Sequence, residues 1–314
     1  MTIEVLEPGI LTSVQDATGR RQWRHLGVPA GGAADSWSAR LANRLVDNPD
    51  GAALLEVTLI GPTLRVLEAS TAALVGALGA TVDGMPWAPG VSREMRAGSI
   101  IRVSDGEDAR AYLAFGGGIV VEPVLGSTST DLRTGFGGVD GRALRAGDRL
   151  QVGRNRSHEL RRWVGRPPSG PIRIVAGPHA ERLRLERLTD TPWRVGLQSD
   201  RTGARLDGPP LAAAVGEVAS IGLPVGAIQL PPDGTPIIAL ADRPVTGGYP
   251  VPALVIGADV GRVARLRPAD ELRFASVSLE EARLARRTAE EELTAIQPLD
   301  APDDAELGWA GSHE

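Results

Sequence analysis

Short apolar stretches separated by turn residues run along the whole of this 314-residue chain. The sequence holds 39 glycines and 24 prolines, and most apolar stretches end at one of them or at an aspartate. Strands bounded by turn signals at this spacing are typical of all-β barrels and sandwiches. The sequence therefore predicts a mainly β protein. We expect strands at residues 3–6, 54–57, 64–67, 72–75, 100–103, 111–115, 149–152, 172–175, 237–240, 253–255 and 271–274.

Two helices interrupt this pattern. Asp35 is a good N-cap for a helix with Trp37, Leu41 and Leu45 on one face, which ends before Pro49. Near the C-terminus, Ser278 and Glu281 have the spacing of a capping box. The apolar stripe expected on this second helix consists of Ala282, Ala285, Ala289, Leu293 and Ile296.

The arginine-rich residues 154–166, followed by the sequence PPSG, are typical of a linker. We therefore expect an N-terminal β-barrel domain at residues 1–165 and a C-terminal β-barrel domain at residues 170–297. Residues 298–314 are rich in acidic and small residues, and we expect a disordered tail there.

Missing residue types exclude several kinds of chemistry. The chain has no cysteine, and all 34 of its Lys+Arg residues are arginines. Without lysine there is no Walker-type phosphate loop, no Schiff-base amine and no attachment point for biotin. The four histidines lack the spacing of a metal-binding helix, so we expect no metal.

The charge and hydropathy of the chain argue against nucleic acid and membrane as binding partners. A net charge of −5 argues against binding along a nucleic-acid backbone. No apolar run has the length of a membrane helix, and the N-terminal residues do not form a secretory signal. We therefore expect a cytoplasmic protein that binds neither nucleic acid nor membrane.

Residues 222–250 have the densest cluster of informative residues. Two apolar runs flank the turn sequence PPDG at residues 231–234, which predicts a β-hairpin. Gln229 lies in the first run, and Asp242, Arg243, Thr246 and Tyr249 follow the second. The pattern fits either a binding site on a glycine-rich loop or an ordinary hairpin followed by a surface ion pair.

The segment resembles the signature of the biotin-dependent carboxyltransferase-like family. This family includes the C subunit of 5-oxoprolinase, allophanate hydrolase subunit 2, the regulator KipA and part of urea carboxylase. Further resembling blocks occur in the family's order, at residues 8–16 (PGILTSVQD), 27–35 (GVPAGGAAD), 40–43 (RLAN), 111–119 (AYLAFGGGI), 126–138 (GSTSTDLRTGFGG), 177–179 (GPH) and 198–203 (QSDRTG).

The resemblance implies two cyclophilin-like β-barrel domains. It also implies the C subunit of a multi-subunit, ATP-dependent 5-oxoprolinase, a lactam hydrolase that converts 5-oxo-L-proline to L-glutamate and is inactive alone. The expected partners are a KipI-like chain, which corresponds to the B subunit, and a lactam hydrolase that corresponds to the A subunit. ATP would be used through a partner, and biotin would come only on a separate carrier. The alternatives are a carboxyltransferase subunit of a biotin-dependent urea or allophanate system, and a non-catalytic KipA-like regulator.

The resembling blocks also supply candidate site residues. The expected catalytic set is Arg243, Asp242, Tyr249 and Gln229. We expect Arg243 or Arg201 to bind an anion, Asp242 to orient a guanidinium or accept a proton, Tyr249 to donate to an oxyanion and Gln229 to bind an amide. The expected substrate-binding set is Gln15, Asp16, Ser199, Asp200, Arg201, Thr246 and Arg133. Ion pairs of Asp16 with Arg20 and of Asp200 with Arg201 are the structural alternatives. Thr128, Ala34, Thr202 and Ala204 depart from the family pattern, which leaves the substrate open.

Overall fold

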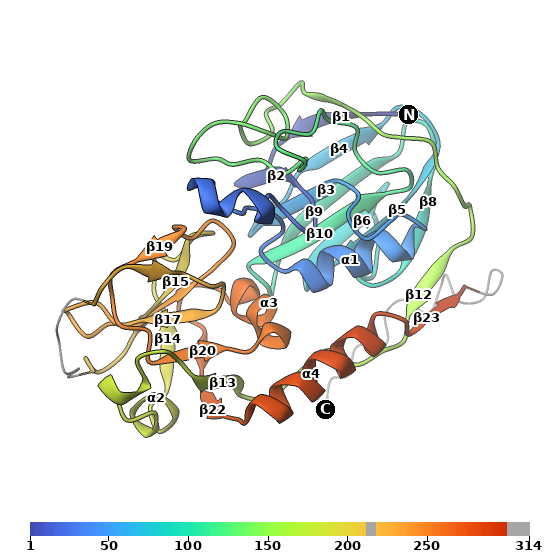
Figure 1. Ribbon diagram of the computed structural model, residues 1–314. Coiled ribbons are helices and arrows are strands. Elements are labelled where there is room, and N and C mark those ends of the chain that lie inside the picture. The colour runs from blue at the N-terminus through green and yellow to red at the C-terminus, as the bar shows by residue number, and fades with distance from the viewer. Residues whose placement is uncertain (212–217, 300–314) are drawn as a thin grey trace. The chain divides into compact units, whose positions relative to one another are not determined.

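The computed structural model describes residues 1–211 and 218–299. These residues are mainly β-structure with few helices, as the sequence predicted, and they form two units (Figure 1). The first unit comprises Met1–Gly19, Ser36–Gly165 and the described residues from Leu293 onward, and the second comprises Arg20–Asp35 and Arg166–Glu292.

These units differ from the predicted domain ranges at two places. Residues 20–35 belong to the second unit, and the chain returns to the first unit at Leu293. The return strand β23 (Ile296–Pro298) pairs with β12 (Arg161–Trp163), so part of the expected linker is a strand instead. The predicted disordered tail lies outside the described residues from residue 300 onward.

Two antiparallel sheets build the first unit. The six-stranded sheet has the order β11-β1-β4-β9-β6-β7, and the five-stranded sheet has the order β2-β3-β10-β5-β8. The strands of the first are β1 (Thr2–Glu7), β4 (Thr63–Val66), β6 (Leu78–Val82), β7 (Met85–Pro86), β9 (Ile100–Gly106) and β11 (Arg149–Gln151). The strands of the second are β2 (Leu11–Gln15), β3 (Leu54–Thr58), β5 (Ser70–Val75), β8 (Ser92–Met95) and β10 (Arg110–Phe115).

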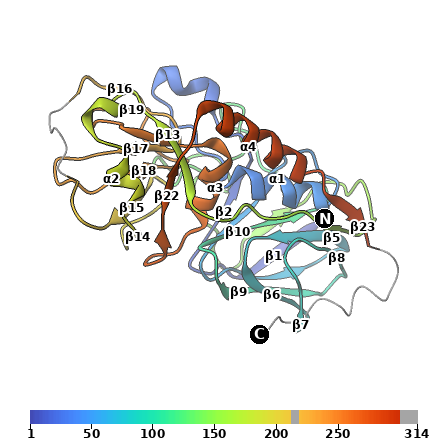
Figure 2. The same cartoon turned by 90° about the horizontal axis from the view of Figure 1, so that it is seen from below.

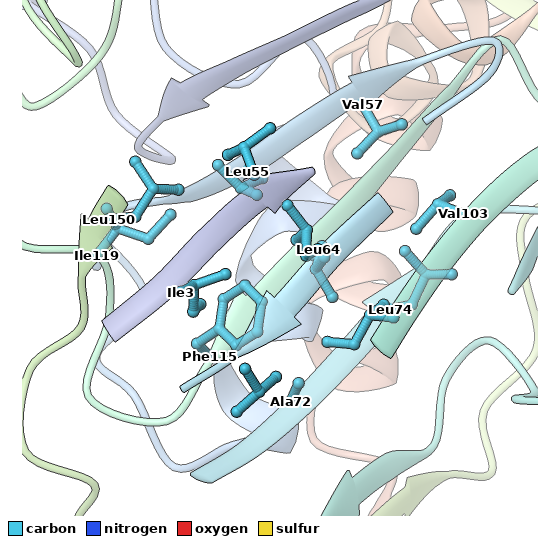
Figure 3. Close-up of a cluster of buried hydrophobic side chains, with 14 of the residues drawn as sticks. Ile3, Leu55, Val57, Leu64, Ala72, Leu74, Val103, Phe115, Ile119 and Leu150 are labelled. Atoms are coloured by element: carbon cyan, nitrogen blue, oxygen red, sulfur yellow. The ribbon is translucent and has the colours of Figure 1, made fainter. Parts of the chain in front are cut away.

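The core of the first unit lies between these sheets. Alternate residues such as Ile3, Leu64, Leu74 and Phe115 point into one buried cluster (Figure 3). The helix α1 (Ser36–Leu45) lies against β3, β5 and β10 (Figure 1). Because the helix covers one face of β10 and the core covers the other, every residue of that strand is buried.

The second unit is built on one eight-stranded sheet, with the order β21-β14-β15-β18-β17-β20-β13-β22. All its pairings are antiparallel except that of β13 with β22. A separate two-stranded ribbon joins β16 (Ile221–Gly222) to β19 (Thr246–Gly247). The strands of the large sheet are β13 (Ile172–Ala176), β14 (Trp193–Val195), β15 (Gly203–Asp207), β17 (Ala227–Gln229), β18 (Ile237–Ala239), β20 (Ala253–Val255), β21 (Glu271–Leu272) and β22 (Phe274–Ser276).

Five short or amphipathic helical segments accompany this sheet. They are η1 (Arg21–Leu26), η2 (Ala180–Arg182), α2 (Glu186–Thr189), α3 (Gly257–Arg265) and α4 (Leu279–Glu292), and α4 packs on α3 and β13 (Figure 2). The predicted capping box is present, because Ser278 Oγ accepts from the Glu281 amide and Glu281 accepts from the Ser278 amide. The predicted stripe was too long: α4 ends at Glu292, and Ile296 lies in β23.

The sequence analysis did not predict α3. Its glycines Gly257 and Gly261 lower helix propensity, but packing requires the second of them. A Cβ on Gly261 would lie 2.2 Å from the Asp35 Oδ1 atom, and Arg265 pairs with the same carboxylate at 3.1 Å. The close approach of Asp35 therefore explains a glycine inside this helix.

Candidate functional site

The predicted hairpin forms within the sheet of the second unit. β17 pairs with β18 through Ile228 with Ile238 and Gln229 with Ile237. β18 also pairs with β15, which begins at Gly203. The polar residues before β15 and after β18 therefore come together at the same end of neighbouring strands.

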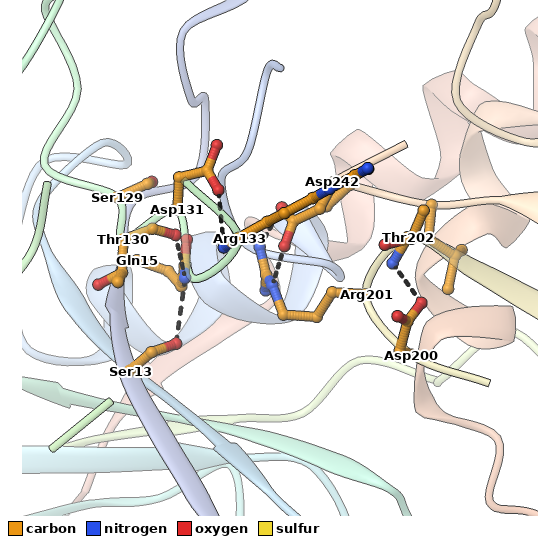
Figure 4. A network of polar contacts seen from close by, with 12 residues as sticks. Ser13, Gln15, Ser129, Thr130, Asp131, Arg133, Asp200, Arg201, Thr202 and Asp242 are labelled. Atoms are coloured by element: carbon orange, nitrogen blue, oxygen red, sulfur yellow. Dashed lines mark hydrogen bonds and ion pairs between the residues drawn. The ribbon is translucent and has the colours of Figure 1, made fainter. Parts of the chain in front are cut away.

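Arg201 and Asp242 form the main ion pair of this end (Figure 4). The Arg201 Nε and Nη2 atoms donate to the two Asp242 carboxylate oxygens at 2.8 and 2.9 Å. Nη2 also donates to the Gly32 carbonyl at 2.7 Å, and only 6% of the Arg201 side chain is exposed. A bidentate guanidinium–carboxylate pair with so little solvent contact holds both groups in one orientation.

Ser199 and Asp200 shape the turn that presents Arg201. The Asp200 Oδ1 atom accepts from the amides of Thr202 and Gly203 at 2.7 and 3.1 Å. Ser199 exchanges hydrogen bonds with the backbone of Arg205. The alternative ion pair of Asp200 with Arg201 does not form, because the Arg201 guanidinium is directed to Asp242.

Arg243 has a different environment from Arg201. The residue is 8% exposed, and its Nε and Nη1 atoms donate to the carbonyls of Leu223 and Leu240 at 2.8 and 3.1 Å. Within the described residues, no carboxylate lies at ion-pair distance from Arg243. Carbonyl oxygens orient the guanidinium without neutralising it, so this site keeps a positive charge.

Gln229 lies against the glycine-rich loop. Its Nε2 atom is so close to Gly247 that a Cβ there would lie 2.5 Å away. The half-buried amide makes no hydrogen bond to any described residue. Thr246, in the ribbon strand β19, and Tyr249, just beyond it, are both exposed.

Gln15 belongs to the first unit and is fully buried. Its Nε2 atom donates to the Ser13 hydroxyl and the Thr130 carbonyl, each at 3.1 Å (Figure 4). Its Oε1 atom is buried and accepts no hydrogen bond from the described residues. Arg133, on the loop after Thr130, has an exposed side chain, while its backbone amide donates to Asp131.

Asp16 is held by hydrogen bonds within the first unit. One carboxylate oxygen accepts from the amides of Thr18 and Gly19, and the other accepts from the Ser127 hydroxyl and the Thr128 amide. Burial alone would raise the pKa of Asp16, but hydrogen bonds from Ser127 and these backbone amides together lower it. The carboxylate thus fastens the loop containing Ser127 to the end of β2.

We expect Asp16→Asn to destabilise the protein at neutral pH by about 1.5–3 kcal/mol, because an amide replaces charge-assisted acceptors. A carboxyl whose folded-state pKa is lowered stabilises the fold above its unfolded pKa, near 4, and loses this contribution as the pH falls. The gap in melting temperature between wild type and variant should therefore shrink from pH 7 to pH 3. A gap that stays constant with pH contradicts this assignment.

The described residues were also searched for a metal site and for a membrane-spanning helix. Within residues 1–211 and 218–299, no group of three or more His, Cys, Asp or Glu side chains has an arrangement that would hold a metal ion. Across the same residues, no helix combines the length and the apolar character that crossing a membrane requires.

Comparison with known proteins identifies the class of this fold and site. The family model described as "Carboxyltransferase domain, subdomain A and B" matches residues 26–276. This match extends over more than half of the chain and includes the hairpin, the Arg201 turn and the glycine-rich loop. The chain belongs to this carboxyltransferase-domain family.

Individual relatives fall into two groups. The chain is 36% identical over 298 residues to the C subunit of 5-oxoprolinase from Escherichia coli (strain K12), covering 91% of this chain and 94% of that protein. It is 31% identical over 327 residues to urea amidolyase of Saccharomyces cerevisiae (strain ATCC 204508 / S288c), covering 95% of this chain but 18% of that protein. The crystal structure of Kluyveromyces lactis urea carboxylase matches with a TM-score of 0.87 at 31% identity, covering 96% of this chain and 30% of that one.

One residue of this site was missed by the sequence analysis. Arg24, in η1, donates through Nη2 to the carbonyls of Leu223 and Val245 at 2.8 and 3.0 Å. Its position three residues before the resembling block at 27–35 is a weak signal. No local pattern places an arginine of residues 20–35 beside the loop after residue 222.

Proposed function

We propose that this chain is the C subunit of an ATP-dependent 5-oxoprolinase, which opens 5-oxo-L-proline to L-glutamate together with partner subunits. The observation that carries the proposal is the match to the C subunit of 5-oxoprolinase over 94% of that protein's length. That relative is named as one subunit of an enzyme, which supports a role for this chain within a complex. The urea carboxylase match, in contrast, covers 30% of a longer chain.

The proposed chemistry uses the polar end of the second unit. Arg243 binds the substrate's carboxylate, because its charge has no carboxylate partner among the described residues. Gln229 recognises the lactam amide through its open donor and acceptor. Asp242 orients Arg201, while Thr246 and Tyr249 supply hydroxyl donors to the oxygen that gains negative charge during ring opening.

The partners supply what this chain lacks. We assign ATP use to the lactam hydrolase that corresponds to the A subunit, and we propose a KipI-like chain, corresponding to the B subunit, as the second partner. The chain has no lysine to which biotin could be attached, so biotin would reach it only on a separate carrier protein. In the first unit, Gln15 and Arg133 are proposed substrate contacts, and Asp16 is proposed to act only by holding its loop.

The test is ATP-dependent glutamate release from 5-oxo-L-proline by this chain purified with the lactam-hydrolase and KipI-like chains of its own genome. We expect glutamate from the complete mixture and a large loss when this chain is omitted. Equal glutamate release with and without this chain contradicts the proposal.

The second candidate is the carboxyltransferase part of a biotin-dependent urea or allophanate system. The TM-score of 0.87 to urea carboxylase over 96% of this chain favours it. Its test replaces 5-oxoproline with urea and bicarbonate, and adds a biotinylated carrier with its carboxylase. Urea-dependent ATP hydrolysis without glutamate release would favour this candidate, and inactivity of intact complexes in both assays would favour a KipA-like regulator.

A further inference from the structure

Two arginines of the second unit share one backbone carbonyl. The Nη2 atom of Arg24 and the Nε atom of Arg243 each donate to the Leu223 oxygen at 2.8 Å. Arg24 also donates to Val245, and Arg243 also donates to Leu240. Because both guanidiniums bond the same oxygen atom, they lie side by side although they are far apart in the sequence.

These two charges lack the carboxylate partners that three other arginines of the unit have. Arg201 pairs with Asp242, Arg265 with Asp35, and Arg173 with Asp259. For Arg24 and Arg243, in contrast, every hydrogen-bond partner among the described residues is a backbone carbonyl. Two neighbouring cations with reduced solvent contact repel each other, so an anion placed between them is strongly favoured.

Donor atoms remain for such an anion. Three donor atoms make no hydrogen bond to a described residue: Arg243 Nη2, Arg24 Nε and Arg24 Nη1. All three keep contact with solvent. Burial also lowers the pKa of Arg24, as expected of a cation with no acidic neighbour. Gln229 lies at the same loop, because a Cβ on Gly247 would meet both the Gln229 amide nitrogen and the Leu223 side chain.

We propose that Arg24 and Arg243 together form a carboxylate-binding site, with Gln229 beside it to recognise the amide of the same molecule. The inference rests on the proposed function and specifies its substrate class: small amides or lactams that carry a carboxylate. A planar carboxylate accepts parallel N–H bonds from guanidinium groups, which a neutral amide does not do. The site therefore selects 5-oxoproline over 2-pyrrolidinone, the same ring without a carboxylate, and over urea.

The test is calorimetric titration of the full-length chain, alone and in the assembled complex, with 5-oxo-L-proline, 2-pyrrolidinone, urea and sodium bicarbonate. We expect 5-oxoproline to bind, and 2-pyrrolidinone and urea to bind at least about 10-fold more weakly, since each lost charge-assisted bond costs about a factor of ten or more. If bicarbonate binds and competes with 5-oxoproline, the site also accepts a small oxyanion that is not attached to an amide.

Single-residue variants test which side chains bind 5-oxoproline. Arg24→Gln and Arg243→Gln should each weaken 5-oxoproline binding about 10-fold or more, while leaving the already weak binding of 2-pyrrolidinone unchanged. Arg194→Gln is the control, because it removes one positive charge from an exposed position on β14 of the same unit. Arg24→Lys retains charge without the planar fork and should lose less affinity than Arg24→Gln.

Several outcomes overturn the inference. They are equal binding of 5-oxoproline and 2-pyrrolidinone, equal affinity of Arg24→Gln and Arg194→Gln, and no binding of any of the four compounds by chain or complex. Its failure is distinct from failure of the proposed function. Glutamate release that needs this chain but is insensitive to Arg24→Gln refutes the site alone, whereas carboxylate binding without glutamate release refutes the reaction alone.

Discussion

Arg243→Ala is expected to lower kcat/KM for glutamate formation by the assembled enzyme at least about 100-fold, which corresponds to about 3 kcal/mol of lost transition-state stabilisation. The reason is that Arg243 is buried, is oriented by two carbonyls and has no carboxylate partner among the described residues. Its charge is therefore available to a bound anion rather than used within the unit.

The measurement is initial-rate kinetics on complexes with confirmed stoichiometry. Arg194→Ala serves as the control for loss of one positive charge, and it should keep activity within about twofold of wild type, because surface changes away from a site have small effects. Circular dichroism of each variant checks that the fold is retained. A kcat/KM within about threefold of wild type for a folded Arg243→Ala complex would remove Arg243 from the site.

Asp242→Ala is expected to reduce the free energy of unfolding of the second unit by about 3–5 kcal/mol, the usual cost of removing one member of a buried ion pair. The variant leaves the Arg201 guanidinium without the carboxylate that accepts its two hydrogen bonds at 2.8 and 2.9 Å. The two side chains are only 6% and 15% exposed, so water replaces little of this interaction.

Hydrogen exchange of the amides in β15 and β18 measures this effect in the second unit itself. Glu186→Gln is the control, since it breaks a surface pair whose Arg184 and Glu186 side chains are 85% and 66% exposed, and should change stability by less than about 0.5 kcal/mol. The double variant Arg201→Met with Asp242→Leu should recover much of the loss, because no unpaired charge remains. Unchanged exchange in Asp242→Ala would show that the pair contributes no net stability.

Much of the local structure was predictable because local rules determine it. Ser278 and Glu281 form their capping box through neighbouring amides, and the PPDG turn joins two apolar runs that pair as β17 and β18. The short apolar stretches bounded by turn residues similarly indicated the buried strands of the first unit. Each of these signals can be recognised from residues that lie close together in the sequence.

Long-range contacts explain what the sequence analysis missed. The helix α3 contains two glycines, and one of them is required by the approach of Asp35 from the other end of the chain. The strand β12, in the expected linker, forms because the last described strand, β23, pairs with it. Local propensity does not report such contacts, since the partner lies more than a hundred residues away.

The sequence by itself determined which chemical groups this protein has. It has arginines but no lysine, it has no thiol, and it has polar residues clustered after a hairpin of apolar strands. The sequence placed Asp200 beside Arg201 and Asp242 beside Arg243, but these residues lie in turns outside the strands, and neither neighbouring pair forms. The pairing of β15 with β18 instead brings Arg201 to Asp242 and leaves Arg243 beside Arg24 on the Leu223 carbonyl. The tertiary structure alone decided which arginine pairs with a carboxylate and which donates only to carbonyls among the described residues, because Coulomb attraction depends on distance in space and not on separation along the chain.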